Sequence, residues 1–246
     1  MKLLIDLGNT RLKWATLENG QLSAQSAVVH QNNFSAIAEQ YLAKISIPGY
    51  IYVASGLEAK FEKELSGWVN AHWQCPIEFI RTSKQAMGVS NAYIKPEDLG
   101  VDRWLNLIAC HHLIAGAACV VDCGTAITVD TIEASGKHLG GCIMPGLDLM
   151  RSSLNRAGQV NIESYSGVDL NCFSHSTQSA IASGTCYAAV KAVDGMLAQI
   201  KNCLDEDITC VITGGDALLI RPLLAVETQY DVDWCMKGMM ILVSDK

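Results

Sequence analysis

The sequence contains no long apolar run, no excess of basic residues and no paired-cysteine motif, and each absence removes a class of protein. No apolar stretch approaches the ~18 residues that a membrane-spanning helix needs. Asp6 interrupts the apolar segment at the start, so we expect no signal peptide either. The 18 Lys and Arg residues are scattered among 25 Asp and Glu, and the formal net charge of −7 argues against binding to nucleic acid.

The ten cysteines form no CxxC pair and have no companion residues at zinc-binding spacing. Most of them, such as Cys119 and Cys210, stand among apolar neighbours, where a free cysteine behaves as a small hydrophobic residue. Half of the 246 residues are hydrophobic and 17% are charged, which indicates a folded chain with one large or two smaller cores. We therefore predict a reduced, cytoplasmic protein.

One pattern occurs twice. Asp6-Leu7-Gly8-Asn9-Thr10 lies between two strand-like runs near the start, and Asp122-Cys123-Gly124-Thr125-Ala126 lies between two such runs near the middle. Strands followed by alternating helices and strands come after each copy. We predict an α/β fold of two similar domains, residues 1–113 and 114–246, with a nucleotide cleft between them.

The periodicity of apolar residues gives the expected elements of each half. In the first half they are strands at 3–6, 11–17, 22–30, 50–55 and 77–82, and helices at 34–45, 57–73 and 102–114. In the second half they are strands at 118–123, 126–133, 138–143, 209–215 and near 230, and helices at 147–155, 176–201, after 215 and from 234.

The turn after each first strand has the composition of a phosphate-binding loop. Glycine lets the backbone approach a ligand closely, and the N–H groups of a tight turn suit phosphate oxygens. A carboxylate would repel phosphate unless a cation such as Mg²⁺ lies between them. A simple turn is the better explanation of one copy, but two copies in two similar halves favour a nucleotide site. The chain has neither GxxxxGK[ST] nor GxGxxG after a strand, so any ATP is bound by another kind of loop.

These hairpins resemble the phosphate loops of the acetate and sugar kinase, heat-shock chaperone and actin superfamily, and residues 212–217 resemble its adenosine loop. Within it, the chain is similar to type III pantothenate kinases. The matching motifs are DLGNTRLK at 6–13, NAY at 91–93, LGVDRW at 99–104, DCGTAITVD at 122–130, GGCIMPG at 140–146, STQSAIASG at 176–184 and TGGDA at 213–217.

The resemblance implies transfer of the ATP γ-phosphoryl group to the primary hydroxyl of pantothenate, the first step of coenzyme A synthesis. It also implies Mg²⁺, a monovalent cation (K⁺ or NH₄⁺), and a homodimer with pantothenate near the interface.

For the substrate side, the resemblance makes Asp102 the general base, a role that phosphoryl transfer requires of an oriented aspartate. Asp102 is equally suited to the positive N-terminus of a helix, and both roles are compatible. The resemblance implies that Arg103 pairs with the pantothenate carboxylate; a surface ion pair is the plainer reading. The remaining substrate residues that it implies are Tyr93, Gly100, Val101 and Thr177. Tyr93 could also be ordinary packing, and Thr177 could belong to a helix N-cap.

For the nucleotide side, the resemblance implies that Asp6 acts on the phosphates through Mg²⁺ and that Asp122 binds the monovalent cation. Thr125 is expected to contact ATP. The expected ATP loop consists of Asp6, Leu7, Gly8, Asn9, Thr10, Arg11, Leu12 and Lys13. Lys13 could instead lie on the solvent face of a strand.

Two other functions fit parts of the pattern. Another small-molecule kinase of the superfamily, such as a sugar kinase, would not require the LGVDRW segment. A non-catalytic ATP-binding regulator, an activity class also described for this family, would not require Asp102. A chaperone-type ATPase would need a substrate domain for which the chain has no room. His111 and His112 lie in an apolar helix, where a packing role is expected, and Met236, Met239 and Met240 have the spacing of a packed helix face.

Overall fold

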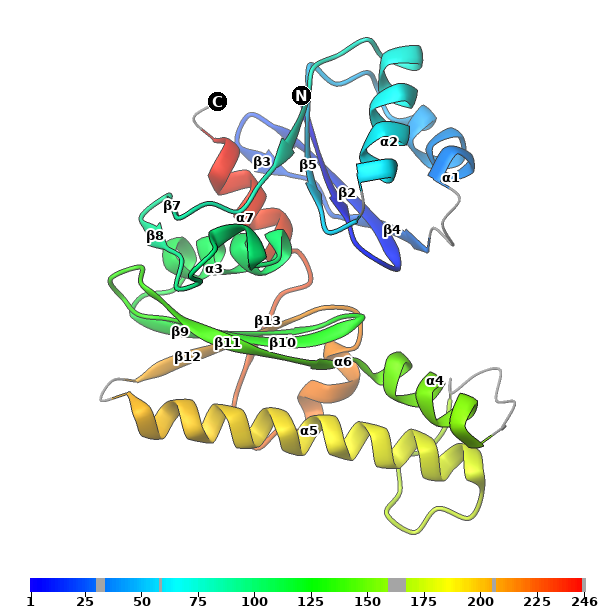
Figure 1. The fold of residues 1–246 in the computed structure, drawn as a ribbon, viewed down its shortest axis with the longest axis vertical. Coiled ribbons are helices and arrows are strands. Elements are labelled where there is room, and N and C mark those ends of the chain that lie inside the picture. The colour runs from blue at the N-terminus through cyan, green and yellow to red at the C-terminus, as the bar shows by residue number, and fades with distance from the viewer. Residues whose placement is uncertain (30–33, 58, 159–166, 205–206, 245–246) are drawn as a thin grey trace. The chain divides into compact units, whose positions relative to one another are not determined.

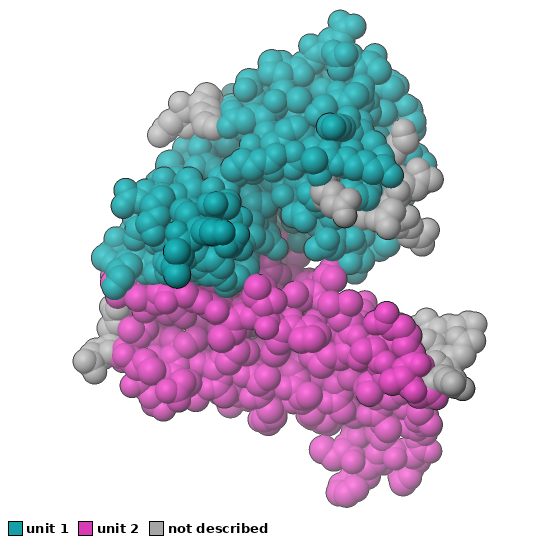
Figure 2. Space-filling model, viewed as in Figure 1, with its two compact units in different colours: residues 1–115, 135–138, 233–246 teal, residues 116–134, 139–232 magenta. Residues whose placement is uncertain are grey.

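The computed structural model describes residues 1–29, 34–57, 59–158, 167–204 and 207–244, which fall into two compact units (Figures 1 and 2). Unit 1 comprises Met1–Ala115, Ser135–His138 and Asp233–Lys246, and unit 2 comprises Gly116–Ala134 and Leu139–Val232. The division expected from the sequence, 1–113 and 114–246, differs in two segments. The turn at Ser135–His138 and the C-terminal helix both pack in unit 1.

Unit 1 is a mixed sheet with helices on both faces. Its strands are β1 (Lys2–Leu7), β2 (Arg11–Glu18), β3 (Gln21–Leu22), β4 (Ser26–Val29), β5 (Tyr50–Ser55), β6 (Ile77–Ile80), β7 (Gln85–Ala86) and β8 (Val89–Ser90). Its helices are α1 (Phe34–Tyr41), α2 (Ala59–His72), α3 (Val101–Leu113) and α7 (Trp234–Val243), with 3₁₀ turns at Leu42–Lys44 and Pro96–Asp98. The sheet order is β3-β2-β1-β5-β6, with β4 also on β2; β1 runs antiparallel to β2 and parallel to β5.

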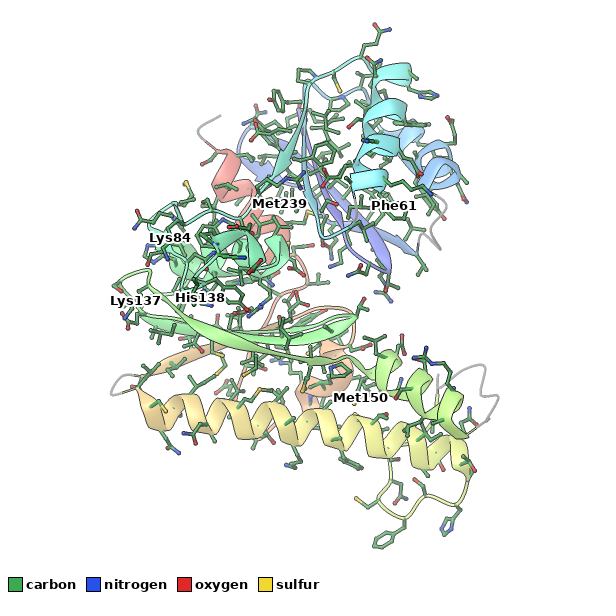
Figure 3. All side chains as sticks on the ribbon, in the orientation of Figure 1. Phe61, Lys84, Lys137, His138, Met150 and Met239 are labelled. Atoms are coloured by element: carbon green, nitrogen blue, oxygen red, sulfur yellow. The ribbon has the colours of Figure 1, made fainter. Side chains whose placement is uncertain are left out.

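Alternation along β1 explains why helices cover both faces of this sheet. Leu3 and Ile5 lie in a core with Trp68 of α2. Leu4 lies in a separate core with Leu105 of α3 and with Met239 of α7, which Figure 3 labels. Figure 1 shows α1 and α2 on one side of the sheet and α3 and α7 on the other.

Unit 2 repeats the plan with one long helix. Its elements are β9 (Ala117–Cys123), β10 (Ala126–Ile132), β11 (His138–Pro145), α4 (Leu147–Gly158), α5 (Thr177–Cys203), β12 (Ile208–Thr213), α6 (Ala217–Ile220), a 3₁₀ turn at Arg221–Leu223, and β13 (Gln229–Tyr230). The sheet order is β11-β10-β9-β12-β13. Val121 and Val129 of the sheet share a core with Val190 of α5 and Ile220 of α6.

The repeat predicted from the two Asp-Gly turns is present in the topology. In each unit an antiparallel hairpin is followed by strands parallel to its first strand. Asp6 and Asp122 both occupy the penultimate position of that first strand. They face Lys13 and Thr128 across the hairpins.

Two local predictions need correction. The single strand expected at 22–30 is interrupted, because the Ser23 hydroxyl accepts a hydrogen bond from the Thr16 N–H (2.9 Å) and separates β3 from β4. Two residues of the expected elements lie outside the described residues: His30 of this strand and Glu58 of the helix expected at 57–73. The β7–β8 hairpin was not expected. Its turn contains Met87 (φ 49°) and Gly88 (φ 76°), a left-handed pair typical of two-residue hairpin loops.

Two exclusions made from the sequence concern membranes and disulfides. Among the described helices, none has both the length and the apolar character needed to cross a bilayer. All ten cysteines are free thiols.

Candidate active site

In unit 1, the β1–β2 turn presents backbone at the end of a buried strand. The Gly8 N–H donates to the Arg11 carbonyl (3.1 Å), which closes the turn over Asn9 and Thr10. A Cβ placed on Gly8 would lie 3.4 Å from that carbonyl oxygen, which is an ordinary van der Waals contact. Leu7 and Leu12 are buried and anchor the strands, so any contact that these two residues make with a ligand is through backbone.

Asp6 and Lys13 form an ion pair across this hairpin. The Lys13 Nζ lies 3.2 Å from the Asp6 Oδ2, and the two side chains are 25% and 10% exposed. Lys13 is therefore held at the strand end instead of extending freely into solvent. A carboxylate and an ammonium side by side beneath a glycine turn can act on a phosphate from two directions: the ammonium directly and the carboxylate through a cation.

In unit 2, three chain segments meet at the β9–β10 turn. The Gly146 N–H donates to the Thr125 carbonyl (3.0 Å), and the Asp216 N–H donates to the Cys123 carbonyl (2.9 Å). A Cβ on Gly146 would lie 2.3 Å from the Gly124 oxygen, and one on Gly214 would lie 2.5 Å from the Cys123 carbonyl. Gly214 also has φ +96°, a conformation that favours glycine. The turn thus fits against the ends of β11 and β12 only because Gly146 and Gly214, which follow these strands, have no side chains.

The electrostatics of this turn are dominated by carboxylates. Burial raises the pKa of the Cys123 thiol far above its ordinary value, and the nearby carboxylates of Asp122 and Asp216 raise it further. Both carboxylates therefore raise the pKa of the same thiol, although the sequence suggested a cation-binding role for Asp122 only. Among the described residues, no three His, Cys, Asp or Glu side chains gather as a metal cage. Hard cations that keep several waters or phosphate oxygens need only one or two carboxylates, so the oxygen donors present fit such an ion.

Asp102 lies in the first turn of α3 and is exposed, whereas its neighbours Val101 and Arg103 are buried. The Arg103 N–H donates to the Asp102 Oδ1 (2.8 Å), so the carboxylate satisfies one of the backbone donors that every helix start leaves open. A Cβ on Gly100 would lie 2.6 Å from the same oxygen. The helix start stabilises the ionised carboxylate, and the glycine gives it room.

The substrate-side residues of unit 1 form a connected group. The Arg103 Nη1 donates to the Tyr93 hydroxyl (2.8 Å), and the guanidinium carbon lies 5.5 Å from the centre of the Tyr93 ring. Arg103 is 3% exposed, which excludes the surface ion pair that the sequence left open. Tyr93 is half-buried, and its N–H donates to the Asn91 Oδ1 (2.9 Å).

Thr177 is the first residue of α5, directly after the N-cap Ser176, whose hydroxyl accepts from the Ser179 N–H (3.1 Å). The cap is therefore Ser176, which leaves the Thr177 side chain for other contacts. Thr177 lines a groove of about 1010 Å³ between α4 and α5 together with Leu149, Leu154 and Ile181.

The predicted site residues are divided between the two units. Unit 1 holds Asp6 to Lys13, Tyr93 and Gly100 to Arg103, and unit 2 holds Asp122, Thr125 and Thr177. Asp216, expected only as part of the adenosine loop, and His138, expected in no site, also lie beside these residues. The Gly-Gly-Asp motif could have indicated Asp216; no local signal identifies His138.

Comparisons with known proteins agree on one family. A family model described as type III pantothenate kinase matches residues 2–199. A type III pantothenate kinase from Nitrosococcus oceani is 35% identical over 252 residues, covering 100% of this chain and 94% of the relative.

Solved structures resemble the fold. A putative Baf family transcriptional activator from Campylobacter jejuni has a TM-score of 0.60 at 22% identity, covering 99% of this chain and 98% of that one. A putative 2-dehydro-3-deoxygalactonokinase from Sinorhizobium meliloti has a TM-score of 0.55 at 11% identity, covering 98% and 97%. The predicted actin-like α/β fold is thereby confirmed.

The close packing at the β9–β10 turn predicts the effect of Gly146→Ala. The added methyl group meets backbone that cannot move aside, so we expect a loss of about 1–3 kcal/mol in the free energy of unfolding. Gly195→Ala is the control, because Gly195 is an exposed residue of α5 with no atom near its missing Cβ. It should gain up to about 1 kcal/mol from helix propensity. Thermal unfolding measures both variants, and equal stability of Gly146→Ala and wild type would contradict the packing described.

Proposed function

The chain belongs to the type III pantothenate kinase family, and we propose how its residues divide the work of that enzyme. Members of the family use ATP to phosphorylate pantothenate in coenzyme A biosynthesis. The chain is thus an ATP-dependent phosphotransferase: the primary hydroxyl of pantothenate attacks the γ-phosphorus, the bond to the bridging oxygen breaks, and 4′-phosphopantothenate and ADP leave.

Asp102 is the general base in this proposal. Its exposed carboxylate is fixed by the Arg103 N–H and by the space above Gly100, so little rotamer freedom is lost when it meets the substrate hydroxyl. The observation that carries the assignment is this exposed, oriented carboxylate at a helix start, beside the buried Arg103–Tyr93 pair. The proton leaves the hydroxyl for a carboxylate oxygen as the new phosphorus–oxygen bond forms.

Arg103, Tyr93, Gly100 and Val101 hold pantothenate in this account. Arg103 supplies positive charge for the substrate carboxylate, and Tyr93, whose oxygen already accepts from Arg103, still has its own hydroxyl proton to donate. The buried guanidinium is weakly screened, so its interaction with an anion is stronger than that of a surface arginine.

Each glycine turn supplies groups that suit ATP in this proposal. Backbone N–H groups of the turn at Asn9 and Thr10, with the Lys13 ammonium, suit phosphate oxygens, and Thr125 is exposed at the second turn with a hydroxyl to offer. Arg11 is exposed at the start of β2, while the buried Leu7 and Leu12 set the backbone of the loop. Asp6 would hold Mg²⁺, and the ion would supply positive charge next to the phosphates.

Asp122 is the proposed ligand of a monovalent cation, K⁺ or NH₄⁺. This proposal is supported by the two carboxylates at the β9–β10 turn, because Asp122 and Asp216 both raise the pKa of the Cys123 thiol. A cytoplasmic location is proposed with it, supported by the ten free cysteines, which suit a reducing compartment.

Family membership favours this enzyme over the two alternatives. A sugar kinase of the superfamily shares the turns but does not require the Tyr93–Arg103 pair. A regulator that only binds ATP has no use for a base at Asp102, so the activity of an Asp102 variant distinguishes it.

Asp102→Asn keeps the size and most hydrogen bonding of the side chain but removes its basicity. We expect kcat for pantothenate-dependent ADP release to fall on the order of 10²- to 10⁴-fold, with ATP binding and thermal stability close to wild type. Asp98→Asn is the matched control, because Asp98 is an exposed residue of the preceding 3₁₀ turn. Turnover that survives in Asp102→Asn would remove the proposed base while leaving the kinase intact.

The same family resemblance leads us to propose a homodimer, with the groove between α4 and α5 in its interface. Leu149 and Leu154 are 44% and 46% exposed on the wall of this groove, and Ile143 at the end of β11 is 61% exposed. The exposed Leu149 and Leu154 share one groove wall, and apolar side chains grouped in this way are typical of an interaction surface. Thr177, in the same groove, would then lie at the interface, where the resemblance places the substrate.

Leu154→Asp should convert the dimer to a monomer, because it places a charge within an apolar interface. Sedimentation velocity at micromolar concentration measures the change. Ile47→Asp, a change of another exposed residue (64%) in unit 1, should leave the dimer intact. A wild-type chain that sediments only as a monomer would overturn the dimer, and a dimeric Leu154→Asp would place the interface elsewhere.

A further inference from the structure

His138 is a buried histidine to which the account above gives no role. It is 1% exposed and belongs to the Ser135–His138 segment, which packs in unit 1 although the strands on either side of it, β10 and β11, form part of the unit 2 sheet. Figure 3 labels His138 with its neighbour Lys137 below α3. The turn therefore packs in the same unit as the proposed substrate residues Tyr93 and Arg103.

The imidazole of His138 contacts the segment that carries Tyr93. The two rings are nearly parallel, with an interplanar angle of 13° and centroids 6.1 Å apart. The Ala92 N–H donates to the Nδ1 at 3.4 Å, so this nitrogen is the acceptor in the contact. His138 therefore contacts both the Tyr93 ring and the backbone directly before it.

Tyr93 passes this contact on to Arg103. Its hydroxyl accepts the 2.8 Å hydrogen bond from Arg103, and its ring lies 5.5 Å from the guanidinium carbon. His138, Tyr93 and Arg103 thus form a continuous series of contacts that ends one residue from Asp102. The histidine ring is thus connected, through Tyr93, to both side chains assigned to pantothenate.

The turn that carries His138 is itself rigidly placed. The Ser90 N–H donates to the Gly136 carbonyl (2.9 Å). A Cβ on Gly136, which has φ +85°, would lie 2.2 Å from the Gly88 oxygen and 3.0 Å from the ring of His111. The His112 Nε2 lies 2.8 Å from the Met87 carbonyl. The histidine pair of α3, the β7–β8 hairpin and the turn before β11 are therefore packed against one another next to His138.

We propose that His138 is a positioning residue for pantothenate: it orients Tyr93, and through Tyr93 the Arg103 guanidinium, without touching the reacting atoms. The inference rests on the proposed roles of Tyr93 and Arg103. Removing the support misplaces both side chains, and misplacement of about 1 Å is enough to cost up to about 100-fold in efficiency. The effect falls on pantothenate and leaves ATP almost unchanged, since none of the residues proposed for the ATP loop belongs to this series of contacts.

Three variants separate the two contacts. His138→Phe keeps a flat ring against Tyr93 and loses the acceptor for Ala92. His138→Asn keeps an acceptor near the position of Nδ1 and loses the ring. His138→Ala loses both, and we expect it to raise the KM for pantothenate at least about tenfold with the KM for ATP within about twofold of wild type. The Phe and Asn variants should lie between Ala and wild type. His72→Asn, on the exposed end of α2, controls for loss of a histidine.

A double-mutant cycle identifies the route of the effect. If His138 acts through Tyr93, His138→Asn should add little to the pantothenate KM of a Tyr93→Ala enzyme, so the two changes are strongly non-additive. A merely structural role predicts equal losses for both substrates, lower thermal stability, and additive effects, and that outcome would overturn the inference. If His138→Ala does not fold, the Phe and Asn variants carry the same comparison.

The turnover of the wild-type enzyme distinguishes a failure of this inference from a failure of the proposed function. A wild-type enzyme without pantothenate-dependent turnover would remove the function and the inference with it. A wild-type enzyme that turns over, with His138 variants of unchanged pantothenate KM, would remove the inference alone.

Discussion

Close approach of backbone to backbone at the ends of the first strands is the constraint on which the rest of this structure depends. In unit 2, Gly146 and Gly214 lie against the Cys123–Thr125 turn at distances that leave no room for a Cβ. This approach brings Asp122, the Thr125 turn and Asp216 together at one edge of a sheet. A polar site can form there because the strands behind it are buried in the core of unit 2, so its carboxylates and N–H groups lie on a packed base.

The same hairpin occurs in both units, but the two copies have different surroundings. The first pairs Asp6 with Lys13, so a cation and an anion stand together. In the second hairpin, Asp122 is paired across the strands with Thr128, and Asp216 lies near the same turn. Two carboxylates therefore contribute negative charge there. This difference fits a division of labour in which the first copy holds phosphates with Mg²⁺ and the second holds a monovalent cation. Unit 1 carries α3 in addition, with Asp102 and Arg103, the residues proposed for the base and for the pantothenate carboxylate.

Much of this architecture could be predicted from the sequence, because the signals are local. The apolar alternation of the first strands and the repeated Asp-Gly turn predict two similar sheets, and the strand orders agree. The motif at Leu99–Trp104 likewise places Asp102 at a helix start. The exchange of segments between units could not be predicted: the packing of α7 on α3 brings Gly238 against the Leu105 backbone, and Gly136 meets Gly88, both across long sequence separations. The support from His138 has the same origin, since its ring contact with Tyr93 spans two elements and leaves no periodic pattern.

The central claim is that the Asp6 hairpin binds phosphates through a divalent cation. Calorimetric titration of ATP with and without Mg²⁺ tests it most directly, on wild type, on Asp6→Asn and on Glu18→Gln at the exposed far end of β2. The account predicts that Mg²⁺ tightens ATP binding at least about tenfold in wild type and in Glu18→Gln, a difference of about 1.4 kcal/mol, and that this gain nearly disappears in Asp6→Asn. An equal gain from Mg²⁺ in Asp6→Asn and wild type would contradict it.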